Sequence, residues 1–185
     1  MSLGHANVTR RGYDYVGPGW IRDRAAGAPA GTIVRSAADV LGWIERNGQD
    51  RDRSGCVTAT FIVDEEGDLR LADRRSEHVA CAGGGRVLAA GEVTFSIPPG
   101  GAGVEVEGVT NHSTGYCPEP ESWAMVAAAF GVAGLRSPGG YTSELVFRRC
   151  PACRSINVVK DHAFDCAVCG SELPTGWNLA HDSPP

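Results

Sequence analysis

The stretch from Cys56 to Leu71, CVTATFIVDEEGDLRL, predicts a β-hairpin. Its first half is rich in β-branched and aromatic residues, which favour strands. The residues at 64–67, DEEG, are typical of a turn, and the apolar and polar residues at 69–71 alternate as in a half-buried strand. The hairpin therefore makes an antiparallel sheet the centre of the predicted fold.

Further strands are predicted on the C-terminal side of this hairpin. Residues 86–97 and 104–110 have strand composition and are separated by the turn-forming residues Pro98-Pro99-Gly100-Gly101. We expect them to continue the hairpin as an antiparallel meander. Residues 141–149, YTSELVFRR, also alternate and lead directly into Cys150, so we expect the segment after them to be joined to the sheet.

Two helices are predicted around the strands. Ser36 and Asp39 stand at capping-box spacing, apolar residues follow at 40, 43 and 44, and Asn47-Gly48 ends the pattern after about three turns. Residues 121–130 carry apolar side chains at 123, 126, 127 and 130, the spacing of one helical face. The fold class expected is α+β, a mostly antiparallel sheet with two helices and a C-terminal zinc-ribbon module.

Length and composition limit the domain organisation. With 185 residues, 42% of them hydrophobic and 21% charged, the chain suits one buried core and a small added module. We expect an N-terminal arm at 1–35, held partly by Tyr13, Tyr15 and Trp20, a core domain at 36–147, a zinc ribbon at 148–177 and a tail at 178–185. No apolar run reaches the roughly 20 residues of a membrane span, and the first residues lack a secretory pattern. A cytoplasmic protein is therefore expected.

The charge pattern argues against a protein that coats phosphate backbones. The net charge is −5, and residues 141–185 carry four basic and five acidic side chains. Nucleic acid is thus a disfavoured partner. Arg148-Arg149 could be anion contacts, but surface charge is the simpler interpretation. Lys160 is the single lysine against 16 arginines, which indicates a GC-rich, bacterial origin.

Two C-x-x-C pairs predict a metal site. Cys150 and Cys153 form the first pair, Cys166 and Cys169 the second, and 12 residues separate them. This spacing suits two knuckles joined by a hairpin, and four thiolates complete a closed tetrahedral Zn²⁺ site with no position for water. One structural Zn²⁺ is therefore expected. Redox pairs or free thiols, and iron in a rubredoxin-like site, are the alternatives.

The segment 148–177 resembles a zinc ribbon. Gly170, directly after the second pair, matches the ribbon pattern, whereas Arg154 stands where ribbons often carry glycine. Trp177, near the end of this segment, is interpreted as a residue that packs against the ribbon or the sheet.

A second polar cluster occupies residues 75–85 and 110–118, with the strand residues Ala89-Ala90-Gly91-Glu92 between them. Residues 76–131 resemble a segment of plant IQ-motif calmodulin-binding proteins and of bacterial toxin-associated domains. Ser113, Tyr116 and Pro118 match its Ser-Gly-His-Tyr-x-Pro motif, but Thr114-Gly115 replace the Gly-His pair. The resemblance implies a β-β-helix scaffold and no particular reaction.

Cys117 in this cluster has three interpretations. A position just before a helix lowers a thiol pKa, so Cys117 could be a nucleophile with His112 or His78 as its base. It could instead be a small buried residue among turn-forming neighbours. In a third interpretation, His78, Cys81, His112 and Cys117 bind a second zinc ion.

The function expected from these observations is a binding or interaction module with a structural Cys₄ zinc site. Its partner would be a protein or a small molecule. A cysteine-dependent hydrolase or transferase using Cys117 is the alternative, and a nucleic-acid-binding zinc ribbon is the second alternative.

Overall fold

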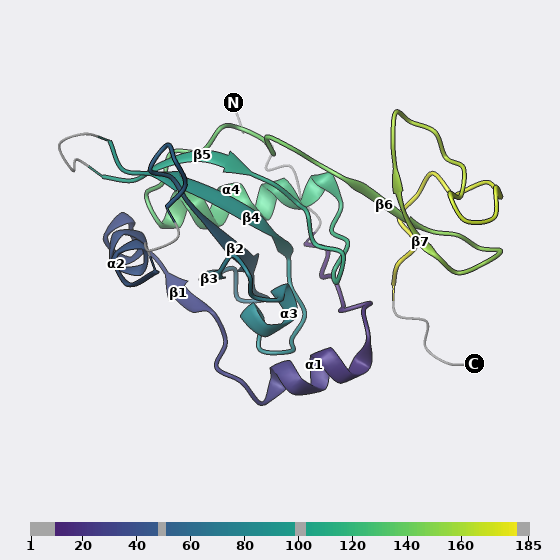
Figure 1. Cartoon of the computed structure of the whole chain (residues 1–185), viewed down its shortest axis with the longest axis horizontal. Helices are drawn as coiled ribbons and strands as arrows, with labels where there is room; N and C mark the ends of the chain where they lie inside the picture. The colour runs from purple at the N-terminus through teal and green to yellow at the C-terminus, as the bar shows by residue number, and fades with distance from the viewer. Residues whose placement is uncertain (1–9, 48–50, 99–102, 181–185) are drawn as a thin grey trace, which may run out of the picture.

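A five-stranded antiparallel sheet is the centre of the protein in the computed structural model, which describes residues 10–47, 51–98 and 103–180 (Figure 1). The strand order is β1-β3-β2-β4-β5. The bounds of these strands are β1 Thr32–Val34, β2 Val57–Val63, β3 Leu69–Asp73, β4 Ala89–Ser96 and β5 Glu105–Val109. All four pairings are antiparallel. The predicted α+β class and the strands near 56–63, 69–71, 86–97 and 104–110 are thus confirmed.

The strand order differs from the meander that the sequence predicts. Strand β3 pairs with β2 as a hairpin, with Phe61 opposite Leu71, but β4 pairs with the other edge of β2. The reason is β1, which lies inside the predicted arm and occupies the outer edge of β3. The chain therefore passes from β3 to β4 through a short helix, α3 (His78–Cys81), before it returns beside β2.

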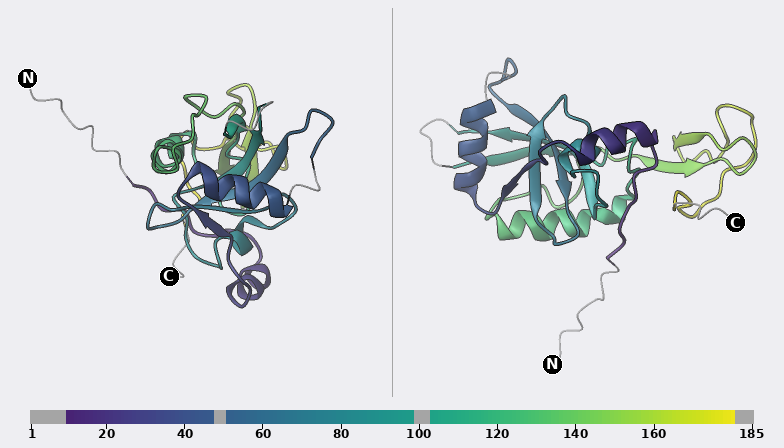
Figure 2. Two further views of the ribbon diagram at one scale, coloured as in Figure 1. Left: turned by 90° about the vertical axis from the view of Figure 1, so that its left-hand side faces the viewer. Right: turned by 90° about the horizontal axis from the view of Figure 1, so that it is seen from below.

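Helices cover both faces of the sheet, as the two views of Figure 2 show. On one face lie α2 (Ala37–Asn47) and α4 (Trp123–Val132), the latter preceded by the 3-10 turn η2 (Pro120–Ser122). On the other face lie α3 and α1 (Gly19–Ala26). The two predicted helices are confirmed, but the described residues contain four α-helices, of which α1 and α3 were not predicted.

Strand β2 shows how the sheet separates two cores. Phe61 and Val63 point toward α2 and α4, whereas Ile62 between them packs with residues from α1 and α3. All three side chains are buried. Because successive side chains alternate between the faces, a continuous apolar run here indicates a strand covered on both sides.

Two tyrosines attach the N-terminal arm to the sheet. Tyr13 forms an antiparallel bridge with Val87, and its N–H donates to the Val87 carbonyl at 2.7 Å. Tyr15 lies edge-on to Tyr116, with ring centroids 5.7 Å apart. Trp20, however, is 66% exposed on α1. The prediction that aromatic residues hold the arm is confirmed for the tyrosines and wrong for Trp20.

A separate two-stranded sheet begins the C-terminal module, which we define as residues 146–180. It consists of β6 (Val146–Arg149) and β7 (Ile156–Val159), and it lies at the end of the molecule opposite α2 (Figure 1). Of the strand predicted at 141–149, the last four residues form β6 and the first five do not belong to a strand. Strand β6 pairs with β7 and not with the five-stranded sheet, although Thr110 and Ser143 form an isolated bridge. The predicted join to the sheet is thus confirmed only at residues 142–143, where Thr142 N–H also donates to the Val109 carbonyl at 2.8 Å.

Some expectations fall outside the described residues. These are the start of the arm, the helix stop at Gly48 and most of the turn at residues 98–101. Within the described ranges, no helix has the length and apolar character that a membrane crossing requires.

Candidate metal centre and its junction with the core

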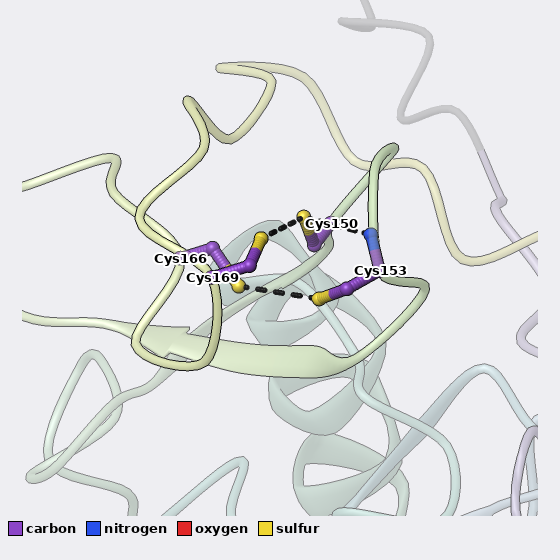
Figure 3. A group of neighbouring side chains, drawn as sticks. All are labelled: Cys150, Cys153, Cys166 and Cys169. Carbon is purple, nitrogen blue, oxygen red and sulfur yellow. Dashed lines mark hydrogen bonds between the residues drawn. The ribbon is translucent and has the colours of Figure 1, made fainter.

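The four cysteines of the two C-x-x-C pairs form one cluster. Their sulfur atoms all lie within 4.8 Å of one another. The closest contacts link the two pairs, with 3.6 Å between the sulfurs of Cys150 and Cys169 and 3.6 Å between those of Cys153 and Cys166 (Figure 3). Four thiolates at about 2.3 Å from a tetrahedral Zn²⁺ are about 3.8 Å apart. The cluster could therefore hold a metal ion such as zinc.

The backbone forms the same turn at each pair. Arg154 N–H donates to the Cys150 carbonyl and Gly170 N–H to the Cys166 carbonyl, both at 2.9 Å. Arg154 and Gly170 have φ angles of 65° and 74°, in the left-handed region that favours glycine. Arginine in place of glycine therefore leaves the first turn intact, at a cost in backbone strain.

Hydroxyl and amide groups surround the sulfur atoms. Ser155 Oγ lies 3.4 Å from Cys153 Sγ, and Ser171 Oγ lies 3.4 Å from Cys169 Sγ. Backbone N–H groups, first that of Cys169, lower the pKa of Cys166 to about 6. Thiols bind metal as thiolates, so these donors favour the ligand form. The two serines were not among the predicted site residues, although both pairs share the pattern C-x-x-C-x-S.

Asn157 connects the β6–β7 hairpin to the second pair. Its buried side chain accepts a hydrogen bond from Ala167 N–H at 2.9 Å and donates to Cys166 Sγ at 3.5 Å. Because hydrogen-bonded neighbours orient metal ligands, Asn157 is a positioning residue for Cys166.

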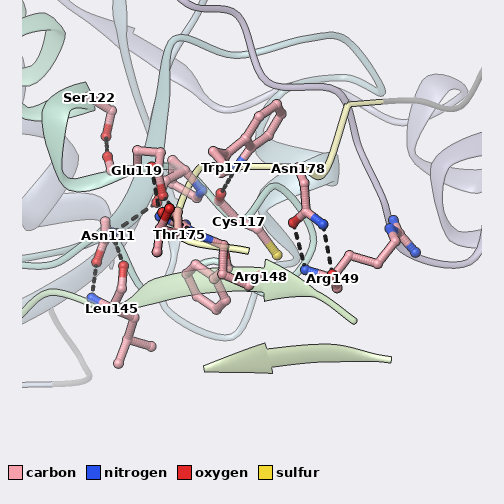
Figure 4. A network of polar contacts seen from close by, with 12 residues as sticks. Asn111, Cys117, Glu119, Ser122, Leu145, Arg148, Arg149, Thr175, Trp177 and Asn178 are labelled. Carbon is pink, nitrogen blue, oxygen red and sulfur yellow. Dashed lines mark hydrogen bonds and ion pairs between the residues drawn. The ribbon is translucent and has the colours of Figure 1, made fainter. Parts of the chain in front are cut away.

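Arg148 anchors this module to the core (Figure 4). Its guanidinium pairs with Glu119, at 2.7 Å between Nη1 and Oε1, and also donates to the Thr175 carbonyl at 2.7 Å. The Arg148 side chain is 6% exposed. The interpretation of Arg148 as surface charge is therefore wrong. The pairing could not be predicted from local sequence, because Glu119 lies 29 residues earlier in the chain.

Two asparagines hold the backbone at the two ends of β6. Asn111 is fully buried, donates to the carbonyls of Pro118 and Leu145 at 2.9 and 2.8 Å, and accepts from Leu145 N–H at 2.7 Å. Asn178 makes a reciprocal pair of hydrogen bonds with the backbone of Arg149, at 2.8 and 2.7 Å. Asn111 thus fixes the residue directly before the module, and Asn178 ties the end of the module to its first strand.

Trp177 lies at the same junction. Its indole N–H donates to the Cys117 carbonyl at 3.0 Å, and its ring meets Tyr13 edge-on at 5.5 Å between centroids. The predicted packing role of Trp177 agrees with these contacts. The ring also borders a cavity of about 520 Å³ lined by the N-terminal arm, the start of α4 and the module, namely by Arg11, Tyr13, Leu88, Glu119, Glu121, Ser122, Met125, Gly176 and Trp177.

Cys117 does not have the environment of a nucleophile. It is fully buried, its thiol contacts the Thr114 carbonyl at 3.2 Å, and burial raises its pKa to about 12. Helix α4 begins at Trp123, six residues later, so its N-terminus does not act on the thiol. The lowered thiol pKa of the nucleophile interpretation is wrong, and the small buried residue is the interpretation that the structure supports.

His78, His112 and Cys81 each contact a group other than Cys117. His78 Nε2 lies 3.0 Å from the Gly91 carbonyl, His112 Nε2 lies 3.0 Å from Ser143 Oγ, and the Cys81 thiol contacts the Arg70 carbonyl. Burial lowers the pKa of His78 and raises that of Cys81 to about 12. Among the described residues, the four cysteines of the C-terminal module are the one group arranged to hold a metal. The second zinc site is thus not formed.

Comparison with known proteins adds no relative: no family model, no curated protein and no solved structure matches the chain. The resemblance of residues 76–131 to the IQ-motif proteins accordingly finds no support among family models.

Proposed function

We propose that Cys150, Cys153, Cys166 and Cys169 bind one Zn²⁺ and that the C-terminal module is a zinc ribbon. The observation that carries this proposal is the convergence of four sulfur atoms within 4.8 Å. Four protein ligands complete a tetrahedral shell and leave no position for water or substrate. The zinc is therefore structural, and its binding energy contributes to folding of the module.

We further propose that the protein is a binding or interaction module, with the cavity beside Trp177 as its binding site. Leu173 packs against Cys150 and Cys166, and four residues later the chain reaches Trp177 at the cavity wall. Zinc would thus hold the segment that forms this wall. A volume of about 520 Å³ is within the range of ligand sites. The buried thiol of Cys117 gives the hydrolase or transferase alternative no support.

Zinc content of the intact, reduced protein tests the metal assignment. Native mass spectrometry should find one zinc per chain, and visible absorption should be absent, because an iron-thiolate site is coloured. Cys153→Ser and Cys169→Ser remove exposed ligands and should abolish the bound zinc. Cys56→Ser is the matched control, since Cys56 lies outside the cluster and should keep one zinc. A metal-free wild-type protein, or two zinc ions, would contradict the proposal.

The structural role has its own test. The Cys153→Ser variant should unfold at a lower temperature than the Cys56→Ser variant, and amide exchange should rise in β6 and β7 before it rises in β2. If the metal-free variant keeps the thermal stability and the exchange protection of the wild type, the metal has no structural role.

A further inference from the structure

The cavity beside Trp177 has an aromatic wall and an acidic rim. Tyr13 and Trp177 meet edge-to-face at an interplanar angle of 83°, and both rings line the cavity. Leu88 and Met125 supply apolar surface, and Glu121 lies exposed at the start of η2. A cleft of this composition suits a ligand with an apolar chain and a charged end.

A cation from the chain itself already lies on the indole. The guanidinium carbon of Arg11 lies 5.2 Å from the centre of the Trp177 ring, within the range of a cation–π interaction. Arg11 is exposed and forms no salt bridge with any residue in the described ranges. An exposed cation–π contact is worth about 0.5–1 kcal/mol, so a competing cation could replace Arg11 over the ring.

Glu121 gives the cleft a carboxylate with which a cationic ligand can pair. The carboxylate of Glu119 is neutralised by the buried Arg148 guanidinium, whereas Glu121 has no ion-pair partner in the described part of the chain. If Arg11 moves away, Glu121 is the unneutralised charge at the rim. An anion would meet this carboxylate, and a guanidinium or ammonium group would pair with it.

We propose that the cleft binds a guanidinium or alkylammonium group carried on an apolar chain, which takes the place of Arg11 over Trp177 and pairs with Glu121. The apolar chain would contact Leu88 and Met125. This inference rests on the proposed function, because the zinc ribbon holds Trp177 in place. Arg11 then acts as an internal competitor that covers the site in the absence of ligand.

Such a group can belong to a free small molecule or to an arginine side chain of a partner protein. Two probes distinguish these sources: agmatine, a free guanidine, and the peptide acetyl-Gly-Arg-Leu-Gly-amide. The peptide acetyl-Gly-Glu-Leu-Gly-amide reverses the charge. Each is titrated into the zinc-loaded, ¹⁵N-labelled full chain, and binding is followed through the indole N–H signal of Trp177, assigned with Trp177→Phe.

Saturable shifts with agmatine, with the arginine peptide or with both support the proposal, and the tighter probe identifies the source. The Arg11→Ala variant should bind about two- to fivefold more tightly, since it removes the competing cation–π contact. Glu121→Gln should weaken binding by a similar factor. Glu66→Gln, an exposed carboxylate in the β2–β3 turn, is the matched control and should bind as the wild type does.

Three results would overturn the inference: no saturable shift with either cationic probe, equal binding of the glutamate peptide, or unchanged binding by Arg11→Ala and Glu121→Gln. Zinc is counted in the same samples. One zinc without binding refutes the ligand class and leaves the zinc ribbon intact, whereas absence of zinc refutes the proposed function itself.

Discussion

Arg148 on β6 and Glu119 ahead of η2 form an ion pair across the junction between the C-terminal module and the core, at 2.7 Å between Nη1 and Oε1. Their side chains are 6% and 11% exposed. The remaining donors of the guanidinium are used by the carbonyls of Phe147 and Thr175. The pair thus connects three segments: the start of the module, its end and the core.

Glu119→Gln should destabilise the protein strongly. Gln removes the negative charge and leaves the Arg148 guanidinium buried without a counter-ion, which costs about 3–5 kcal/mol in comparable pairs. Urea denaturation of the zinc-loaded protein measures this loss of unfolding free energy. Glu105→Gln is the control, because it breaks an exposed pair with Arg136 and should change the free energy by less than about 1 kcal/mol. Equal losses for both variants would show that the buried pair does not join the two parts.

Local patterns predicted the parts of the fold that depend on neighbouring residues. The hairpin of β2 and β3, helices α2 and α4, and the four-cysteine cluster each follow from spacing within about 20 residues. The order of strands does not, because β1 is three residues long and its pairing with β3 is decided by sheet edges that no local pattern encodes.

The difference between local spacing and contacts of distant segments also explains which candidate sites were predicted correctly. The two C-x-x-C pairs needed one hairpin to meet, whereas a site from His78, His112 and Cys117 needed strands and loops to bring distant residues together. Burial of Arg148 was equally unpredictable, since its partner Glu119 comes from another segment of the chain.

Gly91→Ala should prevent or severely weaken folding. A Cβ atom at Gly91 on β4 would lie 1.8 Å from the Thr110 carbonyl oxygen. Both atoms are fixed by the backbone, so no side-chain rotation can relieve the clash. We expect a loss above about 3 kcal/mol, by analogy with overpacked cores, or insoluble protein. Gly131→Ala on α4 is the control: nothing lies within 4 Å, and alanine should raise helix stability by about 0.5–1 kcal/mol. Similar melting temperatures for both variants would contradict the close contact.

Stability should fall above pH 9 partly because of Cys117. Burial raises the pKa of this thiol from 9.0 to about 12, so the folded state keeps a proton that the unfolded state loses. The contribution of this thiol to the free energy of unfolding is complete below pH 9 and is lost as the pH rises toward 12. Over that range the free energy of unfolding falls by about 1.4 kcal/mol per pH unit. Urea denaturation between pH 9.5 and 11 should show a smaller slope for Cys117→Ala. Val126→Ala, an apolar truncation, should lower stability and keep the wild-type slope.

Thiol labelling gives an independent check of the same burial. In native, zinc-loaded protein at pH 7.5, iodoacetamide should modify half-buried Cys56 before Cys81 and Cys117, which are buried. Mass spectrometry of the digested protein reports the order. Faster labelling of Cys117 than of Cys56 would restore the reactive-thiol interpretation.

Asn111→Leu should loosen the segment directly before β6 while keeping the volume of the side chain. Asn111 satisfies the Pro118 carbonyl and both backbone groups of Leu145, and leucine would leave these groups without a partner. Each buried group left unsatisfied costs about 1–3 kcal/mol. Besides a lower unfolding free energy, amide exchange at Leu145 should accelerate, because its N–H loses its acceptor. Asn47→Leu is the control, because it removes one half-buried hydrogen bond at the end of α2. It should leave amide exchange at Leu145 unchanged and lower the free energy of unfolding by no more than about 1.5 kcal/mol. Unchanged exchange at Leu145 in Asn111→Leu would mean that other contacts, such as those of Arg148, hold the strand by themselves.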